Sequence, residues 1–460
     1  MSALWTAEAA ARATGGAVAG DWRASGVSID SRTLAPGDLF VALEDVRDGH
    51  DFVADAFARG APAAMVARPP AGVEPSRLLV VGDTQTGLEA LGAAARAATR
   101  ARIVGITGSV GKTGAKSALA QGLARQGATH ASAKSHNNHW GVPLSLAQLP
   151  ADVAFGVFEM GMNHAGEIRR LTAQVKPEVA LITAIAPAHL ENFDDESGIA
   201  RAKAEIFEGL VSDGVAVIPA DSRHTPLLEA AARAAGCARI LRFGAGGEVR
   251  ARDAAADAAG TSVEALVDGT PLRFRVGLPG AHWVTNSLGL LAVVAALGAD
   301  LEDFAASLAG LRAEPGRGRR HRLAVPGGDA TLLDDAYNAN PASMRAALAV
   351  LATAPGRKLA ALGAMKELGP TGSAHHAALA DPLAEAGVAR VFTVGAEMEA
   401  LVARLPAERH AGHAKRADEL VAAVRAELRP GDTLLVKGSL ASGMGALVGA
   451  LTGTAAAEGA

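Results

Sequence analysis

One glycine-rich stretch indicates the fold and the ligand class of this chain: Gly105-Ile106-Thr107-Gly108-Ser109-Val110-Gly111-Lys112-Thr113. An apolar pair precedes it, and an Ala-rich segment typical of a helix follows. A strand, a glycine-rich turn and a helix start form a phosphate cradle, because backbone N–H groups and the helix dipole face the anion. Lys112 adds a charge for the β- and γ-phosphates, and the Thr113 hydroxyl can bind Mg²⁺. The predicted ATP-binding residues are Gly108, Ser109, Val110, Gly111, Lys112 and Thr113.

The match to the usual loop pattern is incomplete. That pattern has Gly about six residues before the Lys, and position 106 is Ile, with glycines at 105 and 108 instead. A Gly-rich turn without a nucleotide is therefore the alternative.

Composition limits the classes of protein that fit. A chain of 460 residues is too long for one core, and 49% hydrophobic with 20% charged residues is globular. A net charge of −4 gives no sign of nucleic-acid binding. One cysteine, Cys237, excludes an internal disulfide framework and suits a cytoplasmic protein. We find no signal-peptide pattern at the start and no apolar run of about 18 residues, so we expect no membrane insertion.

The chain divides into three α/β regions. Residues 1–82 read as a small module with short strands around the Pro36-Gly37 turn. Residues 83–312 alternate strands and helices, which predicts a mostly parallel sheet, with a hairpin at 262–278 in a small side sheet. Residues 313–460 begin with a hairpin at 322–334 and continue as a second open parallel sheet. The predicted central strands are Ile103–Ile106, Val153–Phe158, Val179–Ile182, Val215–Ile218 and Ile240–Phe243.

Two side chains follow strands beside the glycine-rich loop. Glu159 ends one predicted strand, and His189 lies behind Pro187 after the next. Ligands of open α/β sheets bind at this edge, and Mg²⁺ prefers carboxylate and phosphate oxygens. A surface carboxylate and a solvated loop histidine are the alternatives. Composition alone assigns Arg201 and Lys203, on the next helix, to the surface.

These motifs together resemble the Mur ligases, the ATP-dependent amino-acid and peptide ligases of peptidoglycan precursor synthesis, over nearly the whole chain. The resemblance implies that Thr113, Glu159, His189 and a carbamylated Lys203 hold two Mg²⁺ ions, and that Lys112, His189 and Lys203 are catalytic. It also implies that Asn286 contacts the base and that Arg317 and Asp335 reach over the nucleotide from a Rossmann-like third domain.

Further segments resemble the branch of the family that joins D-alanyl-D-alanine to UDP-N-acetylmuramoyl-tripeptide. They are Asp30-Ser31-Arg32, His136-Asn137-Asn138, Asp334–Pro341 and Gly363–Gly369. The resemblance implies an acyl-phosphate intermediate, a monomer, and closure about hinges near residues 82–100 and 312–318. The implied substrate-binding residues are Ser31, Arg32, Asn137, Asn138, Asn338 and Asn340.

The sequence also departs from the family. Gly114 replaces a common Thr, Trp283 a common Asn, Ala364 a common Asp and Leu440 a common Arg. The last leaves the substrate role of the third-domain tail open.

Several alternatives stay open from the residues alone. A diaminopimelate- or lysine-adding ligase, a folate- or cyanophycin-type ligase and a non-catalytic nucleotide switch share the phosphate loop. Asn338 and Asn340 can contact the incoming peptide or shape the turn before Pro341. His375 and His376 read as a solvated helix start.

Overall fold

The central body is built on a nine-stranded sheet, and an interior strand of this sheet, β8, leads into the glycine-rich loop. The computed structural model describes residues 3–133, 135–187, 190–257 and 260–453. Strand order is β16-β15-β14-β13-β12-β11-β8-β10-β9, and pairs from β9 to β14 are parallel. The strands are β8 (Arg102–Thr107), β9 (Thr129–Ala131), β10 (Phe155–Glu159), β11 (Val179–Ile182), β12 (Val215–Pro219), β13 (Arg239–Phe243), β14 (Val249–Asp257), β15 (Gly260–Val267) and β16 (Thr270–Val276).

Helices cover both faces of this sheet, which is why its parallel strands are continuous apolar runs. One face packs against α4 (Lys112–Leu123), α9 (Ala281–Leu297) and α10 (Leu301–Ser307). The other packs against α5 (Gly141–Ala147), α6 (Glu167–Val175), α7 (Glu196–Ala204) and α8 (Thr225–Ala234). The predicted α/β class with a mostly parallel central sheet is confirmed.

The antiparallel strands differ from expectation in their placement. A hairpin forms at β15 and β16, but β14 precedes it and all three strands continue the central sheet. The reason is that β14 pairs with β13 at Phe243 and Val249, so the side chains of β15 and β16 pack under α9 in the same core.

The N-terminal body has a five-stranded sheet in the order β2-β7-β6-β5-β4. Pairs from β4 to β7 are parallel, and β2 is an antiparallel edge strand. The bounds are β2 (Ala17–Val18), β4 (Gly26–Ser28), β5 (Asp38–Val41), β6 (Ala64–Val66) and β7 (Leu78–Val80), with β1 (Trp5–Thr6) and β3 (Arg23–Ala24) as a separate ribbon and helices α1 (Ala7–Thr14) and α2 (Val53–Ala58).

The C-terminal body has a six-stranded sheet in the order β17-β18-β22-β19-β20-β21, parallel except for the β17–β18 hairpin. Helices cover both of its faces. The bounds are β17 (Arg319–Val325), β18 (Gly328–Asp335), β19 (Lys358–Gly363), β20 (Val388–Val394), β21 (His410–Ala414) and β22 (Thr433–Lys437), with α11 (Pro341–Ala352), α12 (Gly372–Ala377), α13 (Ala380–Glu385), α14 (Glu399–Val402), α15 (Val421–Glu427) and α16 (Met444–Thr452).

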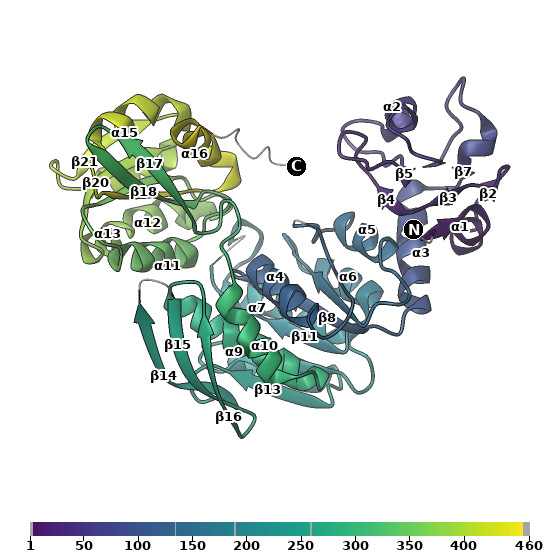
Figure 1. The fold of residues 1–460 in the computed structure, drawn as a ribbon, viewed down its shortest axis with the longest axis horizontal. Helices are drawn as coiled ribbons and strands as arrows, with labels where there is room; N and C mark the ends of the chain where they lie inside the picture. The colour runs from purple at the N-terminus through teal and green to yellow at the C-terminus, as the bar shows by residue number, and fades with distance from the viewer. Residues whose placement is uncertain (1–2, 134, 188–189, 258–259, 454–460) are drawn as a thin grey trace.

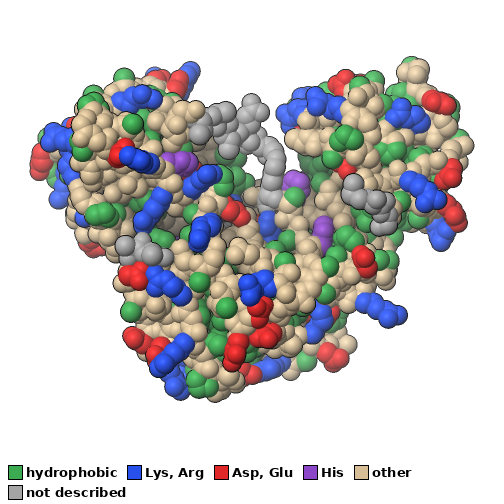
Figure 2. Space-filling model, in the orientation of Figure 1, with side chains coloured by type: hydrophobic (Ala, Val, Ile, Leu, Met, Phe, Trp, Pro, Cys, Tyr) green, Lys and Arg blue, Asp and Glu red, His purple; other side chains and the backbone are tan. Residues whose placement is uncertain are grey.

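Figure 1 shows the N- and C-terminal bodies standing apart on the central one. On the face drawn in Figure 2, Lys and Arg side chains are interspersed with Asp and Glu over all three bodies. Among the described residues, no helix combines the length and the apolar character that crossing a bilayer needs.

A helix occupies the first expected hinge. Helix α3 (Thr84–Ala98) buries Leu88 and Leu91 in the core of the N-terminal body, and that core also takes in Leu144 and Ala147 of α5. The Trp5 indole N–H donates to the Ala147 carbonyl at 2.8 Å. A shared core therefore replaces the flexible connection expected at 82–100, whereas residues 312–318 lie outside helices and strands.

We expect Gly122→Ala to destabilise the protein, because α4 packs against α10 at this glycine. An added Cβ would lie 2.4 Å from two ring carbons of Phe304, which is fully buried. Overpacking of this kind costs about 1–3 kcal/mol, so the midpoint of thermal unfolding should fall. Gly445→Ala in α16 is the control: nothing lies within 4 Å of its added Cβ, and Ala favours a helix over Gly by about 1 kcal/mol. Equal midpoints for the two variants would contradict the packing argument.

Candidate active site

The glycine-rich loop joins the end of β8 to the start of α4 and is held by the segment after β11. Thr183 Oγ1 lies 2.6 Å from the Val110 carbonyl oxygen and 3.2 Å from that of Thr107. The Ser109 N–H donates to the Ala184 carbonyl at 2.8 Å. Glycine is required at 108, because an added Cβ would lie 1.9 Å from Thr183 Oγ1. Gly111 precedes the helix with φ 86°, which leaves the first N–H groups of α4 facing the loop.

Lys112 folds back over this loop. Its ammonium donates to the Gly108 carbonyl at 2.7 Å. Burial lowers the pKa of Lys112; the Glu159 charge opposes this shift, and the Arg317 charge adds to it. The side chain is therefore a cation whose solvation is incomplete, as expected of a group that receives phosphate oxygens.

Glu159 is buried at the end of β10, beside the loop. Its Oε1 accepts a hydrogen bond from Asn137 Nδ2 at 2.8 Å, while its buried Oε2 has no hydrogen-bond partner within the described part of the chain. Thr113, also buried, lies in the first turn of α4. An orphaned carboxylate oxygen, a threonine hydroxyl and a phosphate cradle together fit Mg²⁺.

Lys203 is buried, 1% exposed, so the surface assignment from composition is wrong. The reason is that α7 packs into the core beneath the sheet, where Ile199 and Ala202 are also buried. Burial lowers the pKa of Lys203 well below its ordinary value, and the Lys112 charge lowers it further. Arg201, on the same helix, is exposed. His189, the other expected metal ligand, lies outside the described residues.

A cavity of about 660 Å³ brings most of the expected residues together. It lies between the glycine-rich loop, the start of α9 and the C-terminal body. From the predicted set, it is lined by Ser109, Val110, Gly111, Lys112, Thr113, Asn137, Glu159, Asn286, Arg317, Asp335, Asn338 and Asn340. Gly108, Asn138 and Lys203 are not among the lining residues, and Ser31 and Arg32 belong to the N-terminal body, where Arg32 pairs with Asp30.

The residues of the C-terminal body that line the cavity contact one another and also contact the central body. Lys437, buried at the end of β22, pairs with Asp335 at 2.8 Å. The Arg317 guanidinium lies 4.3 Å from the centre of the Tyr337 ring. The Tyr337 hydroxyl is hydrogen-bonded to Ser135 Oγ at 2.7 Å, across the two bodies.

Three expected substrate residues have structural partners. Asn340 caps α11, with its Oδ1 accepting from the Ser343 N–H at 2.9 Å. Asn138 Oδ1 accepts from the Gly141 N–H at 2.8 Å at the start of α5. Asn338 Oδ1 accepts from the Ala339 N–H at 2.8 Å. These contacts match the turn-shaping alternative for Asn340 and leave peptide contact as a proposal.

Sequence reasoning assigned no role to Thr183, Lys437 or the Ser135–Tyr337 pair. Lys437 could have been found, because it ends a strand in register with Asp335 and shares its sheet edge. Thr183 could have been found in the same way, because it is a polar residue directly after the carboxyl end of β11. Nothing in the sequence predicts the Ser135 contact, since 202 residues separate the two partners.

His376 is fully buried, so its interpretation as part of a solvated helix start is wrong. Its Nδ1 lies 2.7 Å from the Gly372 carbonyl, and its Nε2 accepts the Met365 N–H at 2.9 Å. Both bonds require neutral imidazole with the proton on Nδ1. His376 thereby holds the Gly363–Gly369 segment against α12.

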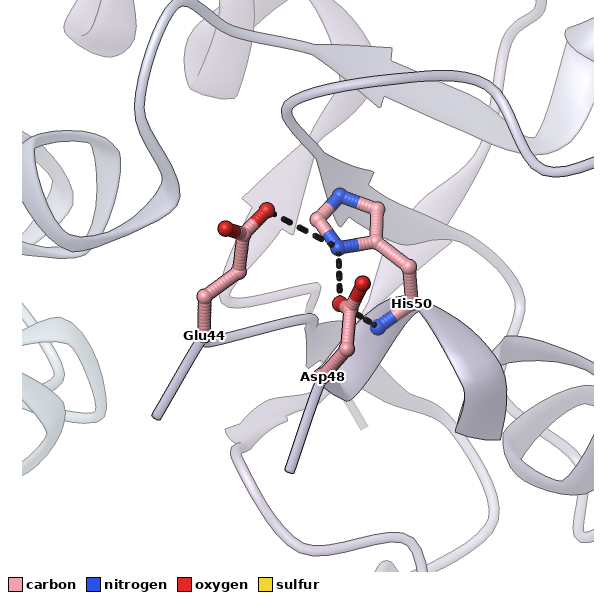
Figure 3. Close-up of side chains that lie close together, drawn as sticks. All are labelled: Glu44, Asp48 and His50. Atoms are coloured by element: carbon pink, nitrogen blue, oxygen red, sulfur yellow. Dashed lines mark hydrogen bonds and ion pairs between the residues drawn. The ribbon is translucent and has the colours of Figure 1, made fainter. Parts of the chain in front are cut away.

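A cluster of Glu44, Asp48 and His50 in the N-terminal body has the spacing of metal ligands (Figure 3). His50 Nε2 accepts the Ala67 N–H at 2.9 Å, so its proton is on Nδ1, which faces Asp48 at 2.7 Å. Arg68 pairs with both carboxylates. A protonated nitrogen and two neutralised carboxylates do not bind a cation, and the cluster fastens the loop before α2 to the sheet.

Comparison with known proteins agrees with this geometry. Three family profiles match, described as "Mur ligase family, catalytic domain" over residues 23–83, "Mur ligase middle domain" over 106–295 and "Mur ligase, glutamate ligase domain" over 316–440. The UDP-N-acetylmuramoyl-tripeptide–D-alanyl-D-alanine ligase of Escherichia coli is 36% identical, covering 92% of this chain and 93% of that protein.

Solved structures give the same result. A crystal structure of MurF from Acinetobacter baumannii superposes with a TM-score of 0.86 at 31% identity, covering 98% of this chain and 99% of that one. MurF ligase from Thermotoga maritima in complex with ADP gives a TM-score of 0.77 at 26% identity, covering 93% of this chain and 97% of that one.

We expect Glu159→Gln to weaken the response to Mg²⁺. The amide removes the charge of the unpartnered Oε2 while keeping the side chain's size. The Mg²⁺ concentration for half-maximal activity should rise roughly 10–100-fold, measured by phosphate release across a Mg²⁺ titration. Glu178→Gln, before β11 at the opposite end of the sheet, should leave the titration unchanged. A wild-type titration for Glu159→Gln would remove this residue from the cation site.

We expect His376 to make stability depend on pH. Burial lowers the pKa of His376, so the unfolded chain takes up a proton at a higher pH than the folded chain does. The free energy of unfolding should therefore fall as pH drops below about 6.5, by up to about 1.4 kcal/mol per pH unit. Urea unfolding between pH 5 and 8 should show a flatter slope for His376→Gln. His139→Gln, at an exposed histidine, is the control and should keep the wild-type slope; equal slopes for both variants would contradict the assignment.

Proposed function

This chain belongs to the Mur ligase family, and we propose that it joins D-alanyl-D-alanine to the terminal carboxylate of UDP-N-acetylmuramoyl-tripeptide, with conversion of ATP to ADP and phosphate, in peptidoglycan precursor synthesis. The observation that carries the proposal is identity of 36% with a ligase of that name over 92% of this chain. The cavity supports it, because a phosphate cradle, a buried carboxylate and third-body residues meet there.

The chemistry requires activation of a carboxylate, which is a poor acylating group. The tripeptide carboxylate attacks the γ-phosphorus of ATP, and ADP leaves, giving an acyl phosphate. The dipeptide amine then attacks the acyl carbon, phosphate leaves, and the amine proton is lost. The first step brings two anions together, so the positive charge of Lys112 and the N–H groups of the loop stabilise its transition state.

We propose that Thr113, Glu159, His189 and carbamylated Lys203 hold Mg²⁺ at this site. When bound, Mg²⁺ supplies positive charge to the phosphate oxygens. The depressed pKa of Lys203 supports carbamylation, because only a neutral amine reacts with carbon dioxide. Arg317, Asp335 and Asn286 are proposed nucleotide contacts, since all three line the cavity.

The partition of the sheets supports three domains, at 1–82, 83–312 and 313–460. We assign the uridine diphosphate moiety to the first, with Ser31 and Arg32 as contacts, ATP to the second, and the dipeptide to the third. Asn137, Asn138, Asn338 and Asn340 are proposed to reach the peptide portions of the substrates. We further propose that the protein acts as a cytoplasmic monomer, which light scattering and cell fractionation would test.

A product assay tests the function directly. The enzyme is incubated with UDP-N-acetylmuramoyl-tripeptide, ATP and Mg²⁺, together with either D-alanyl-D-alanine or free diaminopimelate. The masses of the products are then determined by mass spectrometry. We expect the mass of the UDP-N-acetylmuramoyl-tripeptide to increase by the mass of the dipeptide less one water. Phosphate should be released only when the UDP-N-acetylmuramoyl-tripeptide and the dipeptide are both present. Joining of diaminopimelate instead would favour the alternative, another amide ligase of this family.

We expect Lys203→Ala to reduce ligase activity by roughly 10²-fold. The change removes the amine that would carry the carbamate, and Ala is a strong helix former; because Lys203 is buried, the thermal midpoint of the variant is measured beside its activity. Arg201→Ala on the same helix is the matched control, since Arg201 is exposed and its nearest anion, Asp195, lies 3.8 Å away. Initial rates at saturating substrates give the comparison, and full activity of Lys203→Ala would remove this residue from the site.

A further inference from the structure

Two glycines of the phosphate loop and its helix lie against one face of α9. The side-chain amide of Asn286 lies 3.2 Å from the place where a Cβ on Gly111 would be. Three residues after Gly111 comes Gly114, and three residues before Asn286 comes Trp283. The Trp283 ring carbons Cη2 and Cζ2 lie 2.9 Å and 3.3 Å from the place where a Cβ on Gly114 would be. Residues three apart on a helix share a face, so α9 presents Trp283 and Asn286 together to the loop.

The Trp283 ring cannot move aside easily. It comes from the first turn of α9, is half-buried, and packs on the core that fills one face of the central sheet. Its two χ angles move the whole indole as a rigid plate. A side chain at 114 would therefore collide with ring carbons and not with a flexible chain end.

Gly114 lowers the stability of its helix, and the Trp283 ring occupies the space beside it. Gly114 lies in the first turn of α4, where glycine is less favourable than alanine by about 1 kcal/mol. The indole edge fills the volume that a side chain would take. Gly114 and Trp283 are therefore one packing unit.

Both members of this unit line the cavity. The cavity is also lined by Leu278, Pro279, His282 and Asn286, which are neighbours of Trp283 in the chain. An aromatic face beside a donor and acceptor amide is the pattern that holds a nucleobase, because stacking adds roughly 1–3 kcal/mol per base.

We propose that Trp283 and Gly114 form a matched pair in which the indole contacts the bound nucleotide and fixes the first turn of the phosphate-loop helix. Trp283 is thereby a further specificity and positioning residue. The proposal rests on the proposed function only in requiring an adenine nucleotide in this cavity.

The tryptophans of the chain allow a direct test. There are four, all described, and Trp5, Trp22 and Trp140 pack in or against the N-terminal core. Of these four, Trp283 alone lines the cavity. Titration of the full chain with ADP and Mg²⁺ should change tryptophan fluorescence, with the dissociation constant found by calorimetry. Trp283→Phe should lose this signal and Trp140→Phe should keep it.

The outcomes separate the two proposals. Calorimetric binding without a Trp283-dependent signal overturns the matched pair and leaves the proposed function standing. Absence of ADP and ATP binding in calorimetry overturns the proposed function and this inference with it.

A double-mutant cycle tests the pairing itself. Trp283→Asn should weaken ADP binding by roughly 5–100-fold, and Gly114→Thr by 10-fold or more, because the new side chain meets the ring. In the Trp283→Asn background, Gly114→Thr should cost less than 3-fold. Additive losses would overturn the pairing.

Stability of each variant without nucleotide completes the test. Variants that keep the wild-type thermal midpoint but bind ADP weakly support the proposal, as does near-normal binding by Trp283→Phe. A lowered midpoint with unchanged ADP affinity would assign Trp283 a purely structural role and overturn it.

Discussion

The contact between Gly108 and Thr183 sets the position of everything else in the site. The Thr183 N–H donates to the Thr107 carbonyl at 2.9 Å, and its hydroxyl reaches Val110. The loop after β8 is thus closed onto the end of β11, and only glycine leaves room for this. Because β8 lies between β10 and β11, Glu159 is the last residue of one neighbouring strand and Thr183 follows the other. The order of the strands therefore brings the carboxylate, the loop and the hydroxyl to one edge of the sheet.

The charges at this edge are unbalanced in a way that favours anionic substrates. Burial lowers the pKa of Lys112 and of Lys203, and the charge of Lys112 disfavours a second positive charge on Lys203. Glu159 is the carboxylate that opposes the shift of Lys112. Burying charge without full compensation costs folding free energy. A triphosphate and a substrate carboxylate restore the balance, so the site is stabilised by the groups on which it acts.

Sequence reasoning succeeded where the signal was periodic or positional. Buried parallel strands are continuous apolar runs, and the ends of those strands located Glu159 and the loop. It failed for Lys203 and His376 because the burial of a polar residue on a small-residue helix depends on what packs over it. The buried set of α7 includes Ala200, Ala202 and Ala204, which give no apolar stripe to mark the lysine. Asn340 shows the same limit at a turn, where a helix cap and a ligand contact require the same residue type.

The C-terminal body is connected to the proposed cation site at Glu159 through a short series of hydrogen bonds. Tyr337 bonds to Ser135, and two residues further along the same loop Asn137 donates to Glu159 Oε1. The Asn137 carbonyl also accepts the Gly161 N–H at 2.8 Å, which fixes the loop beside β10. Movement of the third body away from the cavity would break the Tyr337 bond and free one end of this loop. The placement of the C-terminal body and the orientation of the buried Glu159 carboxylate are therefore not independent, and a ligase that must shield an acyl phosphate from water gains from that dependence.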